Sequence, residues 1–256
     1  MILKGRKYGE SREVLVIIHG LFGQSDNWTG VARKLAESLQ VFVFDLRNHG
    51  DSPHADEITY ELMAEDVVLT LKDAGLNKVH LIGHSMGGKV GMVLAQNYPG
   101  MLKSLTVIDI APKAYKPHHQ QILKGLNAIN PEQISNRTEA EEVLSKYIAE
   151  APVRQFLLKN LSRAASGGFE WKFNLSVLTE KIDEVGKPTN SKRSDIPALF
   201  YTGEKSSYVK ESDHAEILSL FPNAKFVEMA GAGHWLHAEK PAELIATLLE
   251  WVERNA

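Results

Sequence analysis

The chain has 256 residues, of which 43% are hydrophobic and 24% are charged, and its net charge at pH 7 is −3. This length and composition suit a folded globular protein with a full core, and the weakly acidic balance argues against a nucleic-acid partner or an anionic membrane surface. The chain contains no cysteine. Disulfides, a thiol nucleophile and thiolate metal ligands are therefore excluded.

The N-terminal sequence and the lengths of the apolar runs bear on location. Residues 1–6 lack the apolar segment of a signal peptide. No apolar run approaches the roughly 20 residues that a membrane-spanning helix needs. We expect a cytoplasmic protein without membrane insertion, either a monomer or a small homo-oligomer.

Short apolar runs open the chain. Residues 14–18 and 41–44 are typical of strands buried on both faces of a parallel sheet, and residues 1–10 predict one short edge strand. Asp26 is expected to cap the helix between the two buried strands. In the loop that follows, Asp45, Arg47 and His49 are expected to form stabilising hydrogen bonds rather than to take part in catalysis.

Residues 83–87 read Gly-His-Ser-Met-Gly, the G-x-S-x-G pattern, between the apolar run 79–82 and a helical stretch over 86–98. A strand that turns directly into a helix strains its middle residue, and side chains two positions away would collide with the turn. Gly83 and Gly87 satisfy this requirement. A glycine-rich turn also ends many strands without any function, but the flanking strand and helix favour Ser85 as a nucleophile.

Two backbone N–H groups are candidates for an oxyanion hole. Met86 follows Ser85 at the start of a helix, so its N–H points toward whatever the serine attacks. Leu21 lies in the glycine-rich segment after the strand at 14–18, where a second donor is expected, and Phe22 is the reserve. The alternative for this segment is a plain strand-to-helix turn.

Residues 58–74 predict a helix that ends at Gly75, and residues 105–110 predict the next strand. The alternation of strands and helices argues for right-handed βαβ units and a parallel sheet. Asp109 lies at the carboxyl end of its strand, where function gathers in such sheets. It is a candidate acid of a triad, with a helix cap or a loop-stabilising role as the alternative.

The alternation breaks over residues 112–194, which contain amphipathic helical patterns punctuated by proline and glycine. Helices are predicted at 120–129, 138–150, 153–165 and 175–185, with a short extended piece at 169–173. A helical insertion at this place would cover the serine like a lid. Candidates for the lining of an apolar acyl pocket are Phe156, Leu157, Trp171 and Phe173.

A small basic cluster begins this segment and consists of Lys113, Lys116, His118, His119 and Lys124. The ordinary explanation is a solvated face, and contact with an acidic substrate such as a coenzyme A thioester is the alternative. A metal site at His118 and His119 is disfavoured, because no carboxylate or thiolate ligand accompanies these two histidines in the sequence. No metal or cofactor is expected.

Strands and helices return after this segment, at 197–203, 215–221, 225–229 and 242–252. His234 follows the last strand on a glycine-rich loop and can reach over the sheet to Ser85 as a general base. His237 is its competitor and is expected to pack or to cap a helix. The chain order Ser85, Asp109, His234 is the order in which α/β-hydrolases carry their triad.

Several sequence blocks together resemble the α/β-hydrolases, in particular the YbfF-type esterases of bacteria. The blocks are His-Gly-Leu-Phe-Gly at 19–23, Asp-Leu-Arg-Asn-His-Gly at 45–50, Gly-His-Ser-Met-Gly-Gly-Lys at 83–89, Asp-Ile-Ala-Pro at 109–112 and Gly-Ala-Gly-His-Trp at 231–235. The resemblance implies an α/β-hydrolase fold with a mostly parallel central sheet flanked by helices. It implies a core over 1–111 and 195–256 and a helical cap over 112–194, inserted after the strand that ends near Asp109.

One departure from the usual family pattern concerns the triad acid. Most α/β-hydrolases carry it shortly after the strand that here ends at Gly203, but this chain has no aspartate there until Asp213. Asp109, one strand earlier, is a recognised alternative position for the acid in this fold. We favour Asp109, with Glu204 as the fallback.

The resemblance further implies a serine carboxylesterase or thioesterase that hydrolyses short- to medium-chain acyl esters, acyl-CoA among the candidates, through an acyl-enzyme on Ser85 and without a cofactor. The expected partner is a small-molecule acyl ester or thioester. Two alternatives stay open at this point. One is other chemistry on the same triad, such as C–C bond hydrolysis or perhydrolysis, and the other is a ligand-binding sensor with slow turnover.

Overall fold

The structure, a computed structural model, describes residues 1–116, 119–165, 167–189 and 192–256. Within these residues seven strands form one sheet in the order β1-β3-β2-β4-β5-β8-β9. Neighbouring strands are parallel except at one edge, where β1 pairs antiparallel with β3. The strands are β1 (Gly5–Tyr8), β2 (Val14–Ile18), β3 (Gln40–Phe44), β4 (Val79–His84), β5 (Leu102–Ile108), β8 (Ala198–Gly203) and β9 (Ala224–Met229). The predicted mostly parallel sheet with a short N-terminal edge strand is confirmed.

Helices cover both faces of this sheet, because alternate residues of each strand point to opposite faces. Val16 belongs to an apolar layer shared with α2 and α3, whereas Leu15, its neighbour in β2, belongs to the layer shared with α1 and α11. The helices and short 3-10 turns of the core are η1 (Ser25–Trp28), α1 (Thr29–Leu35), α2 (Tyr60–Asp73), α3 (Met86–Asn97), η2 (Pro99–Met101), η3 (Glu211–Asp213), α9 (His214–Leu220), α10 (Leu236–Glu239) and α11 (Pro241–Arg254). Among the described residues, no helix combines the length and the hydropathy needed to span a membrane.

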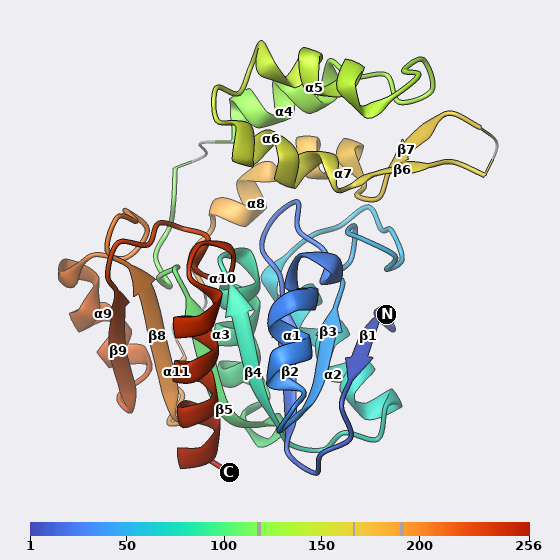
Figure 1. Cartoon of the computed structure of the whole chain (residues 1–256). Helices are drawn as coiled ribbons and strands as arrows, with labels where there is room; N and C mark the ends of the chain where they lie inside the picture. The colour runs from blue at the N-terminus through green and yellow to red at the C-terminus, as the bar shows by residue number, and fades with distance from the viewer. Residues whose placement is uncertain (117–118, 166, 190–191) are drawn as a thin grey trace.

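The chain between β5 and β8 forms a separate layer above the carboxyl ends of the parallel strands (Figure 1). Its elements are α4 (Gln120–Asn127), α5 (Arg137–Ser145), α6 (Ala151–Leu158), β6 (Leu161–Arg163), β7 (Phe169–Trp171), α7 (Leu175–Glu180) and α8 (Ile182–Gly186). In an open parallel sheet this is the edge at which ligands bind. The layer is therefore positioned to cover a site built from the strand ends.

Three helix predictions in this layer were wrong in part. The predicted helix at 138–150 ends at Ser145. The predicted helix at 153–165 ends at Leu158, and the chain then enters the strand β6, which pairs antiparallel with β7. The fully buried side chain of Asn160 donates to the carbonyl of Phe22 at 2.8 Å, which ties the chain to the core at the point where it leaves the helix. The predicted helix at 175–185 is broken at Lys181 into α7 and α8.

The predicted capping role of Asp26 was also wrong. Gln24 precedes the 3-10 turn η1 and forms a reciprocal capping box with Asn27, in which the Gln24 N–H donates to Asn27 Oδ1 at 2.8 Å. The carboxylate of Asp26 instead pairs with Arg6 at 2.6 Å on the surface. Gln24, two positions before Asp26, therefore supplies the cap, since the first turn is a 3-10 turn that starts before the α-helix.

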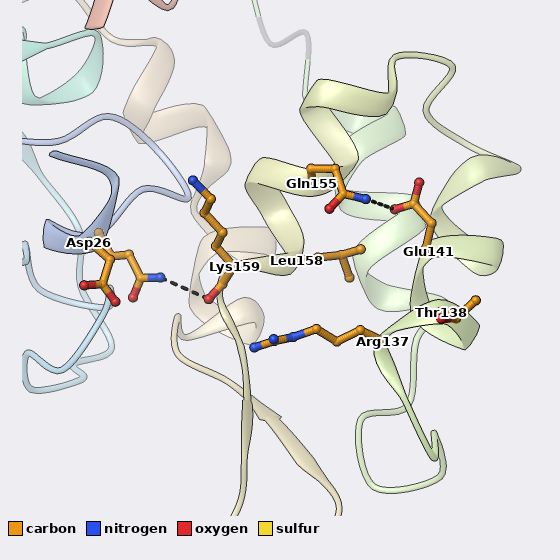
Figure 2. Close-up of a pocket in the computed structure, with 8 residues that line it drawn as sticks. Asp26, Arg137, Thr138, Glu141, Gln155, Leu158 and Lys159 are labelled. Atoms are coloured by element: carbon orange, nitrogen blue, oxygen red, sulfur yellow. Dashed lines mark hydrogen bonds between the residues drawn. The ribbon is translucent and has the colours of Figure 1, made fainter. Parts of the chain in front are cut away.

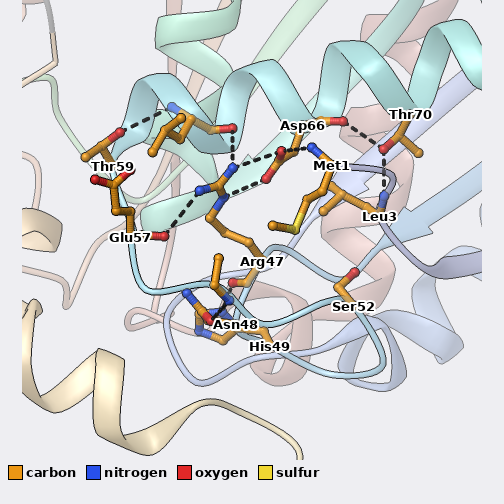
Figure 3. Close-up of polar contacts among 12 residues, drawn as sticks. Met1, Leu3, Arg47, Asn48, His49, Ser52, Glu57, Thr59, Asp66 and Thr70 are labelled. Carbon is orange, nitrogen blue, oxygen red and sulfur yellow. Dashed lines mark hydrogen bonds and ion pairs between the residues drawn. The ribbon is translucent and has the colours of Figure 1, made fainter.

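The loop after β3 is held by the polar side chains that the sequence singled out for this role. Arg47 donates to both carboxylate oxygens of Asp66 in α2, at 2.6 and 2.9 Å (Figure 3). Asp45 accepts the Ser25 N–H at 2.5 Å. His49 Nδ1 lies 2.9 Å from the Arg47 carbonyl, so that ring nitrogen donates and Nε2 is left as an acceptor. These contacts fit the expected stabilising role.

Candidate active site

Ser85 occupies the sharp turn between β4 and α3. Its backbone has φ 53° and ψ −120°, a conformation that costs energy for any residue with a side chain. A β-carbon at Gly83 would lie 2.1 Å from the Gly87 carbonyl oxygen, and one at Gly87 would lie 2.5 Å from the carbonyl oxygen of Ile18. The predicted collision at both glycines is therefore confirmed. Strand, strained serine and helix follow one another as in a nucleophile elbow.

His234 and Asp109 meet at the carboxyl edge of the sheet. His234 Nδ1 lies 2.6 Å from Asp109 Oδ2. The Asp109 side chain is fully buried and also accepts the Gly203 N–H at 3.3 Å and the Ser206 hydroxyl at 2.5 Å. With three donors around it, the buried carboxylate is paired rather than isolated. It accepts a hydrogen bond from the His234 Nδ1–H, and in this tautomer Nε2 is the proton acceptor.

Glu204, the fallback acid, is directed elsewhere. Its side chain is exposed and accepts the Gly231 N–H at 2.5 Å, which ties the loop after β8 to the loop after β9. Of the two candidate carboxylates, the structure brings Asp109 to His234 and leaves Glu204 outside.

Ser206 is a site residue that the sequence analysis missed. It lies in the loop after β8, the place at which most α/β-hydrolases carry their acid, and its hydroxyl reaches across to Asp109 instead. The signal was therefore present in the absence of an aspartate after Gly203. The missing aspartate indicates a role for Ser206 only when β5 and β8 are known to be neighbouring strands.

Ser85 and His234 line one cavity of about 160 Å³. In the described part of the chain no hydrogen bond joins the two side chains. Their proximity is shown by the cavity that both of them line. Phe156 and Leu157 line this cavity, as predicted.

The other two predicted pocket residues lie elsewhere. Phe173 is buried with its ring packed edge-on to Phe22 at a centroid distance of 5.5 Å, and Trp171 stacks on it at 5.1 Å. Neither is among the residues that line the cavity at Ser85. Their rings pack on one another and on Phe22 of the core instead, so this part of the prediction was wrong.

The two candidate oxyanion donors lie together at a smaller cavity of about 30 Å³, which Ser85, Leu21 and Met86 all line. Within the described residues, neither the Leu21 N–H nor the Met86 N–H has a hydrogen-bond acceptor. The N–H of Phe22, the reserve, already donates to His49 Nε2 at 3.2 Å. The Phe22 N–H is therefore engaged, whereas Leu21 and Met86 both line the cavity at Ser85.

Further histidines surround His234 without adding charge. Burial lowers the pKa of His19 to about 4 and that of His237 to about 3, and it also holds the pKa of His84 well below its ordinary value. His84 Nε2 lies 2.9 Å from the His234 carbonyl and donates to it. His237 stacks on Trp28 at 4.3 Å, so it packs, as expected of the competitor.

A larger hollow of about 560 Å³ lies on the other face of α6, between Arg137, Glu141 and Gln155 (Figure 2). Its lining residues carry polar or charged side chains except for Leu158, and neither Ser85 nor His234 is among them. The volume of a cavity therefore does not identify the active site. The cavity at Ser85 is the candidate because Ser85 and His234 both line it.

The predicted basic cluster divides among several roles. Lys113 pairs with Asp213 at 2.5 Å, and Lys124 is exposed. Lys116 lines the smaller cavity, and His119 lines both cavities at Ser85. His118, and with it the histidine pair weighed as a metal site, lies outside the described residues.

Comparisons with known proteins bear on the family and the fold. Residues 13–241 match the family described as the alpha/beta hydrolase fold. The chain is 36% identical to esterase YbfF of Escherichia coli (strain K12), over 93% of this chain and 92% of that protein. It is 38% identical to sn-1-specific diacylglycerol lipase ABHD11 of Mus musculus, over 90% of this chain and 78% of that protein. A solved structure titled marine microorganism esterase aligns with a TM-score of 0.95 and 42% identity, covering 98% of this chain and 99% of that one.

The chain therefore belongs to the α/β-hydrolase fold family. The predicted resemblance to the YbfF-type esterases is confirmed. So is the predicted enzyme class, a carboxylic ester hydrolase.

Proposed function

We propose that this chain is a serine esterase in which Ser85, His234 and Asp109 act as a catalytic triad. The observation that carries the proposal is the 2.6 Å contact between His234 Nδ1 and the buried Asp109 carboxylate, because His234 also lines the cavity that Ser85 lines. The similarity to proteins named esterase and lipase supports the same reaction class.

In the first half of the reaction, Ser85 Oγ attacks the acyl carbonyl carbon and His234 Nε2 takes the hydroxyl proton. Asp109 holds the imidazole in the required tautomer and stabilises the imidazolium. The N–H groups of Leu21 and Met86 donate to the oxyanion, and each such donor contributes roughly 10²–10³ in rate. When the tetrahedral intermediate collapses, the bond to the leaving oxygen breaks and His234 gives that oxygen its proton.

In the second half, water attacks the acyl-enzyme and His234 again acts as the base. The carboxylic acid is released, and Ser85 regains its proton. No redox change and no co-reactant other than water is required. The proposed substrates are short- to medium-chain acyl esters, with acyl thioesters such as acyl-CoA as further candidates.

We also propose that residues 112–194 act as a cap on a core made of residues 1–111 and 195–256. Support comes from α6, whose residues Phe156 and Leu157 line the cavity at Ser85, and from the position of the whole segment above the strand ends (Figure 1). A cap of this kind excludes water from the site and adds apolar surface for the substrate.

The test compares wild type with Ser85→Ala on p-nitrophenyl acetate. Ser219→Ala is the matched control, since Ser219 is exposed and, among the described residues, its hydroxyl bonds only to the Glu216 carbonyl of its own helix. We expect a loss of at least about 10⁴-fold in kcat for Ser85→Ala and no loss for the control. A fluorophosphonate should label wild type once, at Ser85. Substantial turnover by folded Ser85→Ala would refute the assignment, and saturable ligand binding without product release would favour a sensor.

A further inference from the structure

The three residues of the proposed triad are held in different ways. The Ser85 N–H donates to the Ile108 carbonyl of β5 at 2.9 Å. The Asp109 N–H donates to the Tyr201 carbonyl of β8 at 3.0 Å, so the central sheet fixes the backbones of nucleophile and acid. His234 lies outside the sheet, on the loop after β9. A general base must nevertheless stay within hydrogen-bond reach of the proton that it takes.

The backbone of His234 is bonded to a side chain of the strand that carries the nucleophile. His84 is the last residue of β4 and directly precedes Ser85 in the chain. Its side chain is buried, and its Nε2 donates to the His234 carbonyl at 2.9 Å. The centroids of the two imidazole rings are 4.8 Å apart. His84 therefore links the turn at Ser85 to the loop that carries the base.

The backbone at Gly20 lies against the other ring nitrogen of His84. A β-carbon at Gly20 would lie 3.2 Å from His84 Nδ1 and 3.2 Å from the Ser85 β-carbon. Glycine leaves this space free, which allows the backbone before Leu21 to approach the ring closely. One buried ring thus borders the nucleophile, the segment with a candidate oxyanion donor and the loop of the base.

We propose that His84 is a positioning residue, whose Nε2–H holds the His234 carbonyl and thereby sets the distance between Ser85 and the base. This inference rests on the proposed function and deepens it. Within the described residues no hydrogen bond joins the side chains of Ser85 and His234, so their separation depends on how the two backbones are held together. A displacement of about 1 Å in a catalytic group can lower a rate by about 10²-fold.

The charge state of His84 suits this role. Burial, reinforced by the neighbouring rings of His234 and His237, holds the pKa of His84 well below its ordinary value. The ring is therefore neutral near neutral pH and has one N–H, which lies on Nε2 because a carbonyl oxygen can only accept. A neutral donor holds the loop without placing a positive charge beside the imidazolium that forms on His234.

The alternative is that the ring of His84 only fills space, since it also meets the rings of Trp28 and His237 at centroid distances of 6.2 and 5.0 Å. Two substitutions separate these roles. His84→Gln keeps an N–H donor near the position of Nε2 but removes the ring. His84→Phe keeps a ring but removes the donor.

The assay is kcat on p-nitrophenyl acetate and p-nitrophenyl butyrate, with the active sites counted by fluorophosphonate titration. We expect His84→Phe to lower kcat by at least about 10-fold and His84→Gln to stay within about threefold of wild type. The loss should be the same on both esters, because a displaced base slows every acyl transfer, whereas an altered cavity wall changes their relative rates. His84→Asn, whose amide stops short of the carbonyl, replaces His84→Phe if that variant does not fold.

His80→Phe is the matched control, since His80 is a second buried histidine of β4. Its ring nitrogens lie 2.7 Å from Ser104 Oγ and 2.9 Å from Glu13 Oε1, at the start of the strand rather than at its carboxyl end. The control loses the hydrogen bonds of a buried histidine without touching His234. It should unfold at a lower urea concentration, while kcat per active site stays within about twofold of wild type.

Equal losses in His84→Gln and His84→Phe would overturn this inference and assign His84 to packing. A smaller loss in His84→Phe than the one expected, or a loss that differs between the two esters, would overturn it as well. So would a loss in His80→Phe as large as that in His84→Phe. In each of these cases the triad and the esterase function stand. Failure of the wild-type protein on both esters would instead refute the proposed function.

Discussion

Replacing Asp109 by asparagine separates the two candidate acids of the triad. Asparagine has the size of aspartate, and its amide oxygen can replace one of the two carboxylate oxygens, either Oδ1, which accepts from Gly203, or Oδ2, which accepts from Ser206 and His234. It carries no charge, however, and cannot stabilise the imidazolium that forms when His234 takes the proton of Ser85.

The structure sets the size of the expected effect. The Asp109 carboxylate is fully buried and lies 2.6 Å from His234 Nδ1, and among the described residues no other carboxylate contacts that histidine. In a serine triad, loss of such a carboxylate lowers kcat by about 10⁴-fold, or about 5 kcal/mol of transition-state stabilisation. We expect Asp109→Asn to approach that loss.

The matched control is Glu204→Gln. Glu204 is exposed and accepts the Gly231 N–H, a bond that the glutamine oxygen can replace. Its kcat should stay within about twofold of wild type, as for other surface changes. The assay is kcat on p-nitrophenyl acetate near neutral pH, with far-UV circular dichroism to verify folding. A near-normal rate for Asp109→Asn together with a large loss for Glu204→Gln would show that the reasoning is wrong.

Three further predictions concern positioning and stability. Ser206→Ala removes the 2.5 Å bond to Asp109 and should lower kcat by about 10-fold with little change in KM, since a charge-assisted hydrogen bond contributes about 1.5–3 kcal/mol. Lys89 is buried, and its ammonium donates to the backbone carbonyls of Lys113 and Lys187, in the segments that lead into and out of the cap. Burial lowers the pKa of Lys89 to about 7. The unfolded chain then binds more protons than the folded one above that pH, so the free energy of unfolding should rise by about 2 kcal/mol between about pH 7 and 9. Lys89→Met should remove this rise. Gly87→Ala should destabilise the fold by at least about 2 kcal/mol in urea unfolding, because its methyl group would lie 2.5 Å from backbone oxygens.

Each of these predictions has its own control. Ser206→Thr keeps the hydroxyl and should retain more activity than Ser206→Ala, and equal losses would argue against a role for that hydrogen bond. If the free energy of unfolding of Lys89→Met rises with pH as steeply as that of wild type, another group causes the rise. Gly100→Ala is the control for Gly87→Ala, since a methyl group at Gly100 meets nothing within 4 Å. If the two alanine variants unfold alike, steric exclusion at the turn is not what restricts residue 87.

The parts of the fold that depend on local physics were predictable. Strands buried on both faces must be continuous apolar runs, so β2, β3 and β4 could be read directly from the sequence. The turn at Ser85 was predictable for a similar reason, because the atoms that exclude side chains at Gly83 and Gly87 belong to the turn itself and to the adjacent strand.

The cap was less predictable, because contacts distant in sequence override its helical patterns. The periodicity at 153–165 favours a helix, yet the chain leaves it near Asn160, which is bonded to Phe22 of the core, and pairs as β6 with β7. Phe22 is 138 residues away from Asn160, far outside the window over which periodicity is read, and a helical pattern over 153–165 carries no sign of that contact.

The sequence by itself determined the fold class, the strained serine and the candidate base, because each rests on a short motif with its own steric or chemical requirement. Only the tertiary structure decided which carboxylate meets His234. Asp109 lies 125 residues away from it in the chain, and the two become neighbours because β5 pairs with β8 and β8 with β9. The same pairing brings the loop after β8 over Asp109, which gives Ser206 its partner and leaves Glu204 at the surface. Strand order is a property of the whole sheet, so no local pattern could have supplied it.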